Sequence, residues 1–205
     1  MQLPSSRSDE IIVVDGGSKD GTVEIARQYT SRVMTAPRGR GPQQDAGARQ
    51  AHGSVVLFLH ADTRLPVAYE RLIAQALEKP RVVFGAFRLE IDPPSPVLAC
   101  IASMANLRTR LLKMPYGDQA LFVRRDAYFQ AGGFPDWPVM EDVDLVRRLS
   151  HLGGFQLAHG SVRTSGRRWK RENVVFTTLR NWSLMIQYYM GHPPHTLARH
   201  YPDAR

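Results

Sequence analysis

Short apolar runs alternate with segments of helical spacing along the first half of the chain. Runs rich in β-branched or aromatic residues predict strands, and amphipathic or Ala-rich segments predict helices. The predicted strands are residues 10–15, 33–36 and 54–59. The predicted helices are residues 23–29 with Thr22 as N-cap, a segment that follows a loop at 37–44 and ends near Ala51, and residues 67–77. This alternation predicts an α/β fold with a mainly parallel, Rossmann-like sheet flanked by helices.

The second half of the chain is less regular and shows no internal repeat. Strands are predicted at residues 82–91 and 120–123, and helices at 96–112, 142–152 and 172–190. We expect both halves to form one domain over residues 1–205.

The composition is that of a globular protein, with 205 residues, of which 43% are hydrophobic and 22% charged. The net charge of +8 favours a phosphorylated substrate or an anionic membrane surface as partner. Nucleic acid is not expected, because no nucleic-acid-binding motif accompanies the basic residues. The single cysteine, Cys100, excludes a disulfide within the chain, and its apolar neighbours predict a buried, inert thiol.

No apolar stretch is long enough to span a bilayer, and residues 1–9 lack the apolar core of a signal peptide. We therefore expect a cytoplasmic location. The helix predicted at 172–190 has an apolar side with Trp182, Met185 and Tyr189. We expect this side to pack on the domain itself, and peripheral contact with a membrane is the alternative.

The first chemical motif is Asp15, which ends a buried strand and is followed by Gly16 and Gly17. A carboxylate in this place can accept hydrogen bonds from a base or ribose, and glycines allow the backbone to approach a ligand closely. A simple Asp/Gly turn explains the pattern equally well.

The second motif is His60-Ala61-Asp62, at the end of the clearest predicted strand. Mg²⁺ or Mn²⁺ would neutralise a nucleoside diphosphate leaving group there, because such hard cations prefer carboxylate oxygens. Asp62 fits the role of metal ligand, and His60 that of orienting water or phosphate. If the sheet is parallel, Asp15 and Asp62 meet at one edge. The alternative is that Asp62 merely caps a turn.

The third motif is the acidic start of a predicted helix, Glu141, Asp142 and Asp144. Three acids in four positions exceed what helix capping needs, so one of them is a candidate to take a proton from a sugar hydroxyl. Two further groups accompany this motif. Asp118 and Gln119 are candidates on the acceptor side together with Glu141, and Arg167, Arg168 and Trp169 form either a phosphate and sugar grip or a solvated basic loop.

Together these segments resemble glycosyltransferase family 2, which has the GT-A fold. Residues 13–22, residues 57–62 and residues 132–135 followed by Glu141 and Asp142 occur in the family's order and spacing. The match looks closest to the bacterial branch associated with radical SAM genes and arsenosugar biosynthesis. The resemblance implies a nucleotide- and metal-binding half at about 10–91, and an acceptor-binding half with a C-terminal helix at about 92–205.

The resemblance also implies a reaction and residue roles. A sugar would pass from a nucleotide-diphosphate donor, UDP- rather than GDP-linked, to a hydroxyl acceptor with inversion at the anomeric carbon. Asp15 matches the acid that contacts the base, Asp62 the last acid of the Asp-x-Asp metal motif, and Asp142 the general base. Arg167, Arg168 and Trp169 resemble an Arg-Trp motif of some members.

The sequence departs from this family pattern in three places. Gly16 stands where many members have a second acid, and His60 replaces the first acid of Asp-x-Asp. The family's first strand and helix have no counterpart before Glu10. We therefore expect the sheet that these elements would normally cover to be protected by a second copy of the chain in a homo-oligomer, by a swapped segment or by residues 1–9. The alternatives to sugar transfer are nucleotidyl transfer and a catalytically inactive module that binds nucleotide sugars.

Overall fold

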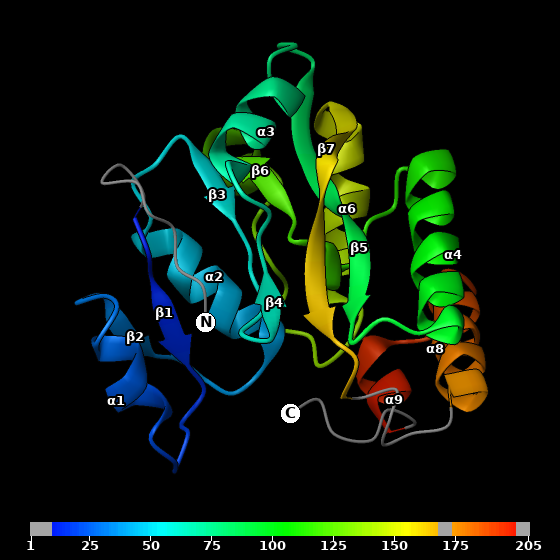
Figure 1. The fold of residues 1–205 in the computed structure, drawn as a ribbon, viewed down its shortest axis with the longest axis horizontal. Coiled ribbons are helices and arrows are strands. Elements are labelled where there is room, and N and C mark those ends of the chain that lie inside the picture. Colours follow the sequence, from blue (N-terminus) through cyan, green and yellow to red (C-terminus); the bar gives the residue numbers. More distant parts are fainter. Residues whose placement is uncertain (1–9, 168–173, 200–205) are drawn as a thin grey trace.

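Two sheets organise the chain, which a computed structural model describes over residues 10–167 and 174–199. In the smaller sheet, β1 (Val13–Asp15) pairs in parallel with β2 (Val33–Thr35). The larger sheet has the order β3-β6-β5-β7-β4 (Figure 1). Its strands are β3 (Val55–Leu57), β6 (Phe122–Arg124), β5 (Val82–Asp92), β7 (Gly154–Ser165) and β4 (Thr63–Arg64).

The α/β class is confirmed, but the prediction of a mainly parallel sheet is wrong for the larger sheet. Only β5 and β7 pair in parallel, whereas β3 with β6, β5 with β6, and β4 with β7 are antiparallel. The sheet is therefore mixed. Apolar runs do not reveal strand direction, because a buried strand is apolar in either orientation.

Helices lie against both sheets (Figure 1). They are α1 (Thr22–Arg27), α2 (Arg40–Gln50), α3 (Tyr69–Ala76), α4 (Pro96–Leu112), α5 (Arg125–Gln130), α6 (Glu141–Leu152), α8 (Val174–Tyr189) and α9 (Pro194–Ala198), with the 3₁₀ turn η1 at Gly117–Gln119. The predicted cap Thr22 is instead the first residue of α1, after the N-cap Gly21, and its hydroxyl bonds to Asp20. The predicted loop at 37–44 is wrong beyond Gly39, since α2 begins at Arg40.

The longest strand, β7, is absent from the sequence predictions. Its residues mix glycine, histidine and other polar side chains, so no apolar run marks it. Tertiary pairing creates this strand, because β5 lies along it in parallel and β4 pairs with its last residues. The site depends on this strand, since its end lies beside Asp62.

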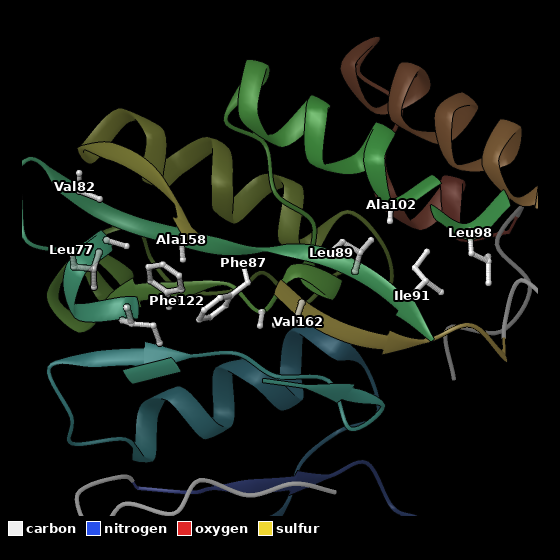
Figure 2. Packing of buried hydrophobic residues seen from close by; sticks show 13 residues of the cluster. Leu77, Val82, Phe87, Leu89, Ile91, Leu98, Ala102, Phe122, Ala158 and Val162 are labelled. Atoms are coloured by element: carbon white, nitrogen blue, oxygen red, sulfur yellow. The ribbon is translucent and has the colours of Figure 1, made fainter. Parts of the chain in front are cut away.

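The larger sheet has a hydrophobic cluster on each face. β5 contributes Phe84 to the cluster with α2, α5 and α6, and Phe87 to the cluster with α3 and α4. Figure 2 shows the second of these, with Phe87, Phe122 and Leu89 between the sheet and its helices. Both phenylalanines of β5 are fully buried. Burial on both faces holds the sheet as a rigid support for the loops at its ends.

Two predictions about burial on the helices are wrong. Cys100 is exposed, because α4 packs through Leu98, Ala102 and Thr109 on its other side. On α8, Thr177 and Leu184 are buried, and Trp182 and Tyr189 are exposed. Periodicity located both helices correctly but did not show which side of each helix packs against the rest of the protein. Within the described residues, none of the helices is both long and apolar enough to span a membrane.

Candidate functional site

Four segments that lie far apart in the sequence converge beside the end of β3. They are the loop with His60 and Asp62, the turn η1 with Asp118, the start of α6 with Asp142, and the first turn of α2 with Arg40. The charges of Arg40, Asp62, Asp118 and Asp142 all act on His60. The fold therefore brings the predicted metal-side, acceptor-side and catalytic residues into one electrostatic cluster.

Asp142 is held at the N-terminus of α6 by two backbone donors. Gly117 N–H donates to its Oδ2 at 2.8 Å, and Val143 N–H donates to its Oδ1 at 2.8 Å. The side chain is half-buried, so it is oriented without being sealed from solvent. A Cβ on Gly117 would lie 3.0 Å from His60 Nε2 and 3.4 Å from Asp142 Oδ2. A side chain at position 117 would therefore crowd His60 and Asp142, and the glycine lets η1 lie close to both.

Glu141, in contrast, points into the protein. It is 2% exposed, and Arg40 Nε lies 2.8 Å from its Oε1. Burial, reinforced by the charge of Asp142, raises the pKa of Glu141 to about 7, although Arg40 opposes the shift. Close packing fixes this pair, because a Cβ on Gly41 would lie 2.5 Å from the Pro135 carbonyl oxygen.

His60 and Asp118 are shifted in opposite directions. Burial, with help from the charge of Arg40, lowers the pKa of His60, so the imidazole is neutral near pH 7. Burial raises the pKa of Asp118 against the opposing charge of Arg108. A neutral imidazole beside carboxylates is a possible metal ligand or hydrogen-bond partner.

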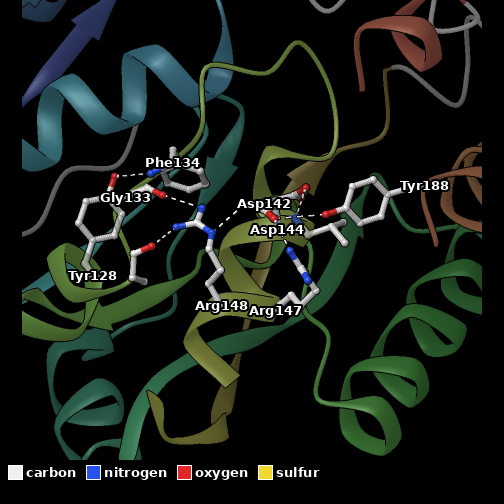
Figure 3. Close-up of polar contacts among 10 residues, drawn as sticks. Tyr128, Gly133, Phe134, Asp142, Asp144, Arg147, Arg148 and Tyr188 are labelled. Atoms are coloured by element: carbon white, nitrogen blue, oxygen red, sulfur yellow. Dashed lines mark hydrogen bonds and ion pairs between the residues drawn. The ribbon is translucent and has the colours of Figure 1, made fainter. Parts of the chain in front are cut away.

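The third acid of the motif, Asp144, is part of a structural network (Figure 3). It is 5% exposed, and it accepts hydrogen bonds from Arg147, Arg148 and Tyr188. Arg148 also donates to the carbonyl oxygens of Ala131 and Gly133. Asp144 thereby ties α6 to α8 and to the turn before α6, and it leaves Asp142 as the solvent-accessible acid of the three.

Gln119 does not reach the surface of the site. It is fully buried, its Oε1 accepts from the Thr109 hydroxyl at 2.7 Å and from Tyr116 N–H at 3.2 Å, and its Nε2 donates to the Phe87 carbonyl at 3.1 Å. This geometry does not let Gln119 contact an acceptor directly, although the sequence had suggested such a contact. Gln119 holds η1 in place, and with it the neighbouring Asp118.

Asp15 lies in the smaller sheet, apart from the strand before Asp62, so the two strands do not share one parallel edge as expected. Its carboxylate accepts from the N–H groups of Gly17 and Ser18 at 2.7 and 2.8 Å and from the Ser18 hydroxyl. The Ser18 hydrogen bonds lower the pKa of Asp15. Gly17 adopts φ 89°, which explains a glycine there without any contact to a ligand.

The end of β7 brings Arg167 to the same region as Asp62. Ser165 N–H donates to the Asp62 carbonyl oxygen at 3.1 Å, and Arg167 follows two residues later, exposed and bonded to the Ser165 hydroxyl. Arg168 and Trp169, which belong to the same predicted group, lie outside the described residues.

Two arginines of the cluster were not identified from the sequence. Arg40 lay in a predicted loop. The sequence indicates its role only indirectly, because a buried acid such as Glu141 needs a cation beside it. Arg108 lies with its guanidinium carbon 3.4 Å from the centre of the Tyr116 ring, just before Asp118. Neither residue belongs to a local motif, so only the tertiary structure assigns them to the site.

The residues near Asp62 fit a divalent cation that is shared with a substrate. Among the residues described, no group of three or more acids, histidines and cysteines forms a preformed metal cage. Asp62 is, however, an exposed carboxylate with His60 two residues away. Mg²⁺ and Mn²⁺ are commonly held by one or two carboxylates, with phosphates and water as the other ligands. This donor set suits an ion that arrives with a diphosphate.

Several solved structures share this fold. The structure of S. aureus TarS 1-349 in complex with UDP-GlcNAc has a TM-score of 0.59, with 16% identity over 76% of this chain and 49% of that one. Mannosyltransferase PcManGT from Pyrobaculum calidifontis, in complex with GDP-Man and Mn²⁺, has a TM-score of 0.55 and 18% identity over 75% of this chain and 47% of that one. At these identities the likeness supports the fold alone, an α/β GT-A-like arrangement with a mixed sheet.

The sequence comparisons identify the family. Glycosyltransferase AglE of Haloferax volcanii is 26% identical over 157 residues, 70% of this chain and 52% of that protein. Probable glycosyltransferase YdaM of Bacillus subtilis is 28% identical over 167 residues, 70% of this chain and 40% of that protein. The chain thus spans about half the length, or less, of these relatives. Residues 2–130 match the family described as Glycosyl transferase family 2, and the chain belongs to that family.

Proposed function

We propose that this chain transfers a sugar from a nucleotide-diphosphate donor to a hydroxyl acceptor, with inversion at the anomeric carbon and with Mg²⁺ or Mn²⁺. The observation that carries the proposal is the position of Asp142. It is half-buried, held by the backbone of Gly117, and next to the His60 loop that bears Asp62. A general base and a diphosphate-side carboxylate therefore lie within one cluster.

Asp142 acts as the general base in this proposal. A sugar hydroxyl becomes a good nucleophile when its proton is accepted as the new bond forms. Two N–H donors and the positive end of α6 stabilise the charged carboxylate and aim it. Direct displacement by the activated hydroxyl inverts the anomeric carbon. Asp118 lies on the acceptor side, whereas the buried Glu141 holds the start of α6 against Arg40.

On the donor side, Asp62 and His60 would hold the cation, which when bound neutralises the charge of the departing diphosphate. Arg167 is placed to contact phosphate oxygens, and Arg168 and Trp169 are proposed to join it. Asp15 would accept hydrogen bonds from the base, with Gly17 allowing its close approach. These assignments rest on the family resemblance and on the placement of each described residue.

The donor class is supported by what structurally similar proteins bind. The structures of TarS and PcManGT contain UDP-GlcNAc and GDP-Man, and glucosyl-3-phosphoglycerate synthase from Mycobacterium tuberculosis was solved with Mg²⁺ and UDP (TM-score 0.50, 18% identity, 77% of this chain and 59% of that one). We propose a UDP-linked donor, and we place the chain in the radical SAM and arsenosugar-associated branch on its motifs.

The test is a product analysis with a panel of UDP- and GDP-sugars, Mn²⁺ and simple hydroxyl acceptors. Release of nucleoside diphosphate together with glycosylated acceptor supports the proposal, and the anomeric configuration of the product reports inversion. Release of pyrophosphate would instead indicate nucleotidyl transfer. Binding of a nucleotide sugar without turnover, for every donor and acceptor tried, would indicate an inactive binding module.

A further inference from the structure

Helix α4 exposes a stripe of large apolar side chains along its outer side. Successive members are three or four residues apart, which places them on one face of a helix. They are Val97, Met104, Leu107 and Leu111, between 46% and 67% exposed, with Cys100 also exposed in the same stripe. The opposite side packs through Leu98, Ala102 and Thr109. The residues of the stripe are therefore not the ones that hold α4 against the sheet.

Helix α8 carries a second stripe of the same kind. Its members are Phe176, Leu179, Trp182, Ile186 and Tyr189, followed by Met190, and each is between 55% and 72% exposed. Leu184 is buried against Val139 and Leu197, and the Tyr188 hydroxyl bonds to Asp144. The other side of this helix thus anchors it to the protein, while large aromatic and aliphatic groups face outward.

The two helices lie side by side at one end of the molecule (Figures 1 and 2). The Tyr189 hydroxyl of α8 lies 3.5 Å from Met114 Sδ, just beyond the end of α4. Large exposed apolar side chains gathered on two neighbouring helices mark an interaction surface rather than scattered surface residues. We define the α4/α8 face as the exposed residues of these two stripes.

Charge decides between the possible occupants of the α4/α8 face. Neither α4 nor α8 contains an acidic residue, and Arg110 and Lys113 are exposed at the end of α4. In a symmetric dimer through this face, the cations of each copy would meet an identical surface. The two helices of that surface have no acidic residue to pair with them. An anionic lipid surface offers an apolar interior for the two stripes and negative headgroups for the two cations. Trp and Tyr are also favoured at lipid–water boundaries.

We propose that the α4/α8 face docks on the surface of an anionic membrane, with the apolar stripes inserted among the lipids and Arg110 and Lys113 against the headgroups. This inference goes beyond the proposed sugar transfer and does not depend on it. It would also bring the site near the membrane surface, because four residues separate α4 from η1 and α8 contacts Asp144, two residues after Asp142. An amphiphilic acceptor at the lipid surface would then lie within reach.

The test is co-flotation of the full chain with vesicles of phosphatidylcholine alone or mixed with phosphatidylglycerol. We expect flotation with the anionic vesicles, weaker binding at high salt, and little binding to neutral vesicles. The double variants L107E/L111E and W182E/I186E should each lower the apparent affinity about tenfold or more, since each places two negative charges within one stripe. R110Q/K113Q should lower it about fivefold for each charge at low ionic strength.

The matched control is Ile25→Glu on α1, which replaces an exposed apolar residue (54% exposed) far from this face. It should float like the parent protein, and circular dichroism verifies that every variant is folded. Absence of flotation with anionic vesicles would overturn the proposal, as would unchanged flotation of either double Glu variant. Concentration-dependent dimers that the Glu variants abolish, without any vesicle binding, would assign the face to a second copy instead.

Discussion

The backbone N–H of Gly117 donates a 2.8 Å hydrogen bond to Asp142 Oδ2, across 25 residues of sequence. This contact joins the turn after α4 to the start of α6. It also links two segments that were separate candidates in the sequence, the acceptor-side turn with Asp118 and the acidic pair with the proposed base. The orientation of Asp142 therefore depends on a residue that has no chemistry of its own.

We predict that Gly117→Ala lowers turnover about tenfold or more without unfolding the protein. The added methyl would lie 3.0 Å from His60 Nε2 and 3.4 Å from Asp142 Oδ2, so His60, Asp142 or the turn must give way, and each of these shifts disturbs the geometry of the site. The measurement is steady-state kinetics. Gly53→Ala is the control, because its methyl would make only an ordinary contact at 3.5 Å. Equal activities of the two variants would show that Gly117 does not position Asp142.

Asp142→Asn should lower kcat on the order of 10²–10⁴-fold, because the amide cannot accept the proton of the attacking hydroxyl. Donor affinity should change little, since the proposed donor contacts come from Asp15, Asp62 and Arg167. Kinetics combined with calorimetric titration of UDP separates these effects. A variant that transfers sugar at nearly the parent rate would shift the assignment to Glu141 or Asp118.

Binding of UDP is expected to depend on Mn²⁺, and this dependence should disappear in Asp62→Ala. The exposed carboxylate is the ligand proposed to link cation and diphosphate. Isothermal titration of UDP with and without Mn²⁺ measures this directly. The same affinity in all four combinations of protein and metal contradicts the assignment, whereas Asp126→Ala, an acid of α5, should behave like the parent protein.

The free energy of unfolding should change with pH as Glu141 ionises. Its pKa is about 7 in the folded protein against 4.5 as the ordinary value, so between these values the folded state binds more protons than the unfolded state. Stability from this residue is therefore present in full below about pH 4.5 and falls as the pH rises to about 7. The loss is on the order of 3 kcal/mol, since a tenfold change in an ionisation constant corresponds to about 1.4 kcal/mol.

Urea unfolding of the parent protein and Glu141→Gln at pH 5 and pH 8 tests this. The Gln variant lacks the titrating group, so its free energy of unfolding should fall less between the two pH values. An identical difference in both proteins would show that the carboxyl of Glu141 titrates normally in the folded state.

Arg148→Met should lower the free energy of unfolding by about 2–3 kcal/mol, because it removes a cation from the buried Asp144 and leaves two carbonyl oxygens without their donor. Arg163→Met is the matched control. Its ion pair with Glu90 is exposed, with side chains 68% and 50% accessible, and its loss should cost about 1 kcal/mol or less. Equal losses in denaturant unfolding would refute the structural role of the Asp144 network.

The sequence by itself determined the local elements and the kind of chemistry. Apolar runs located β1, β3, β5 and β6, because buried strand positions favour apolar side chains. The ordered motifs around Asp15, Asp62 and Asp142 identified the family, which the match over residues 2–130 confirms. These features are readable because each is carried by neighbouring residues.

What the tertiary structure alone decided is the direction of strands and the partners of charged groups. β7 has no apolar run and exists through its pairing with β5 and β4. Arg40 pairs with Glu141, 101 residues away, and Gln119 is sealed inside the protein by Thr109 and Phe87. Such contacts depend on how whole elements pack, and the pattern of hydrophobic residues in one segment does not encode which distant residue will lie against it.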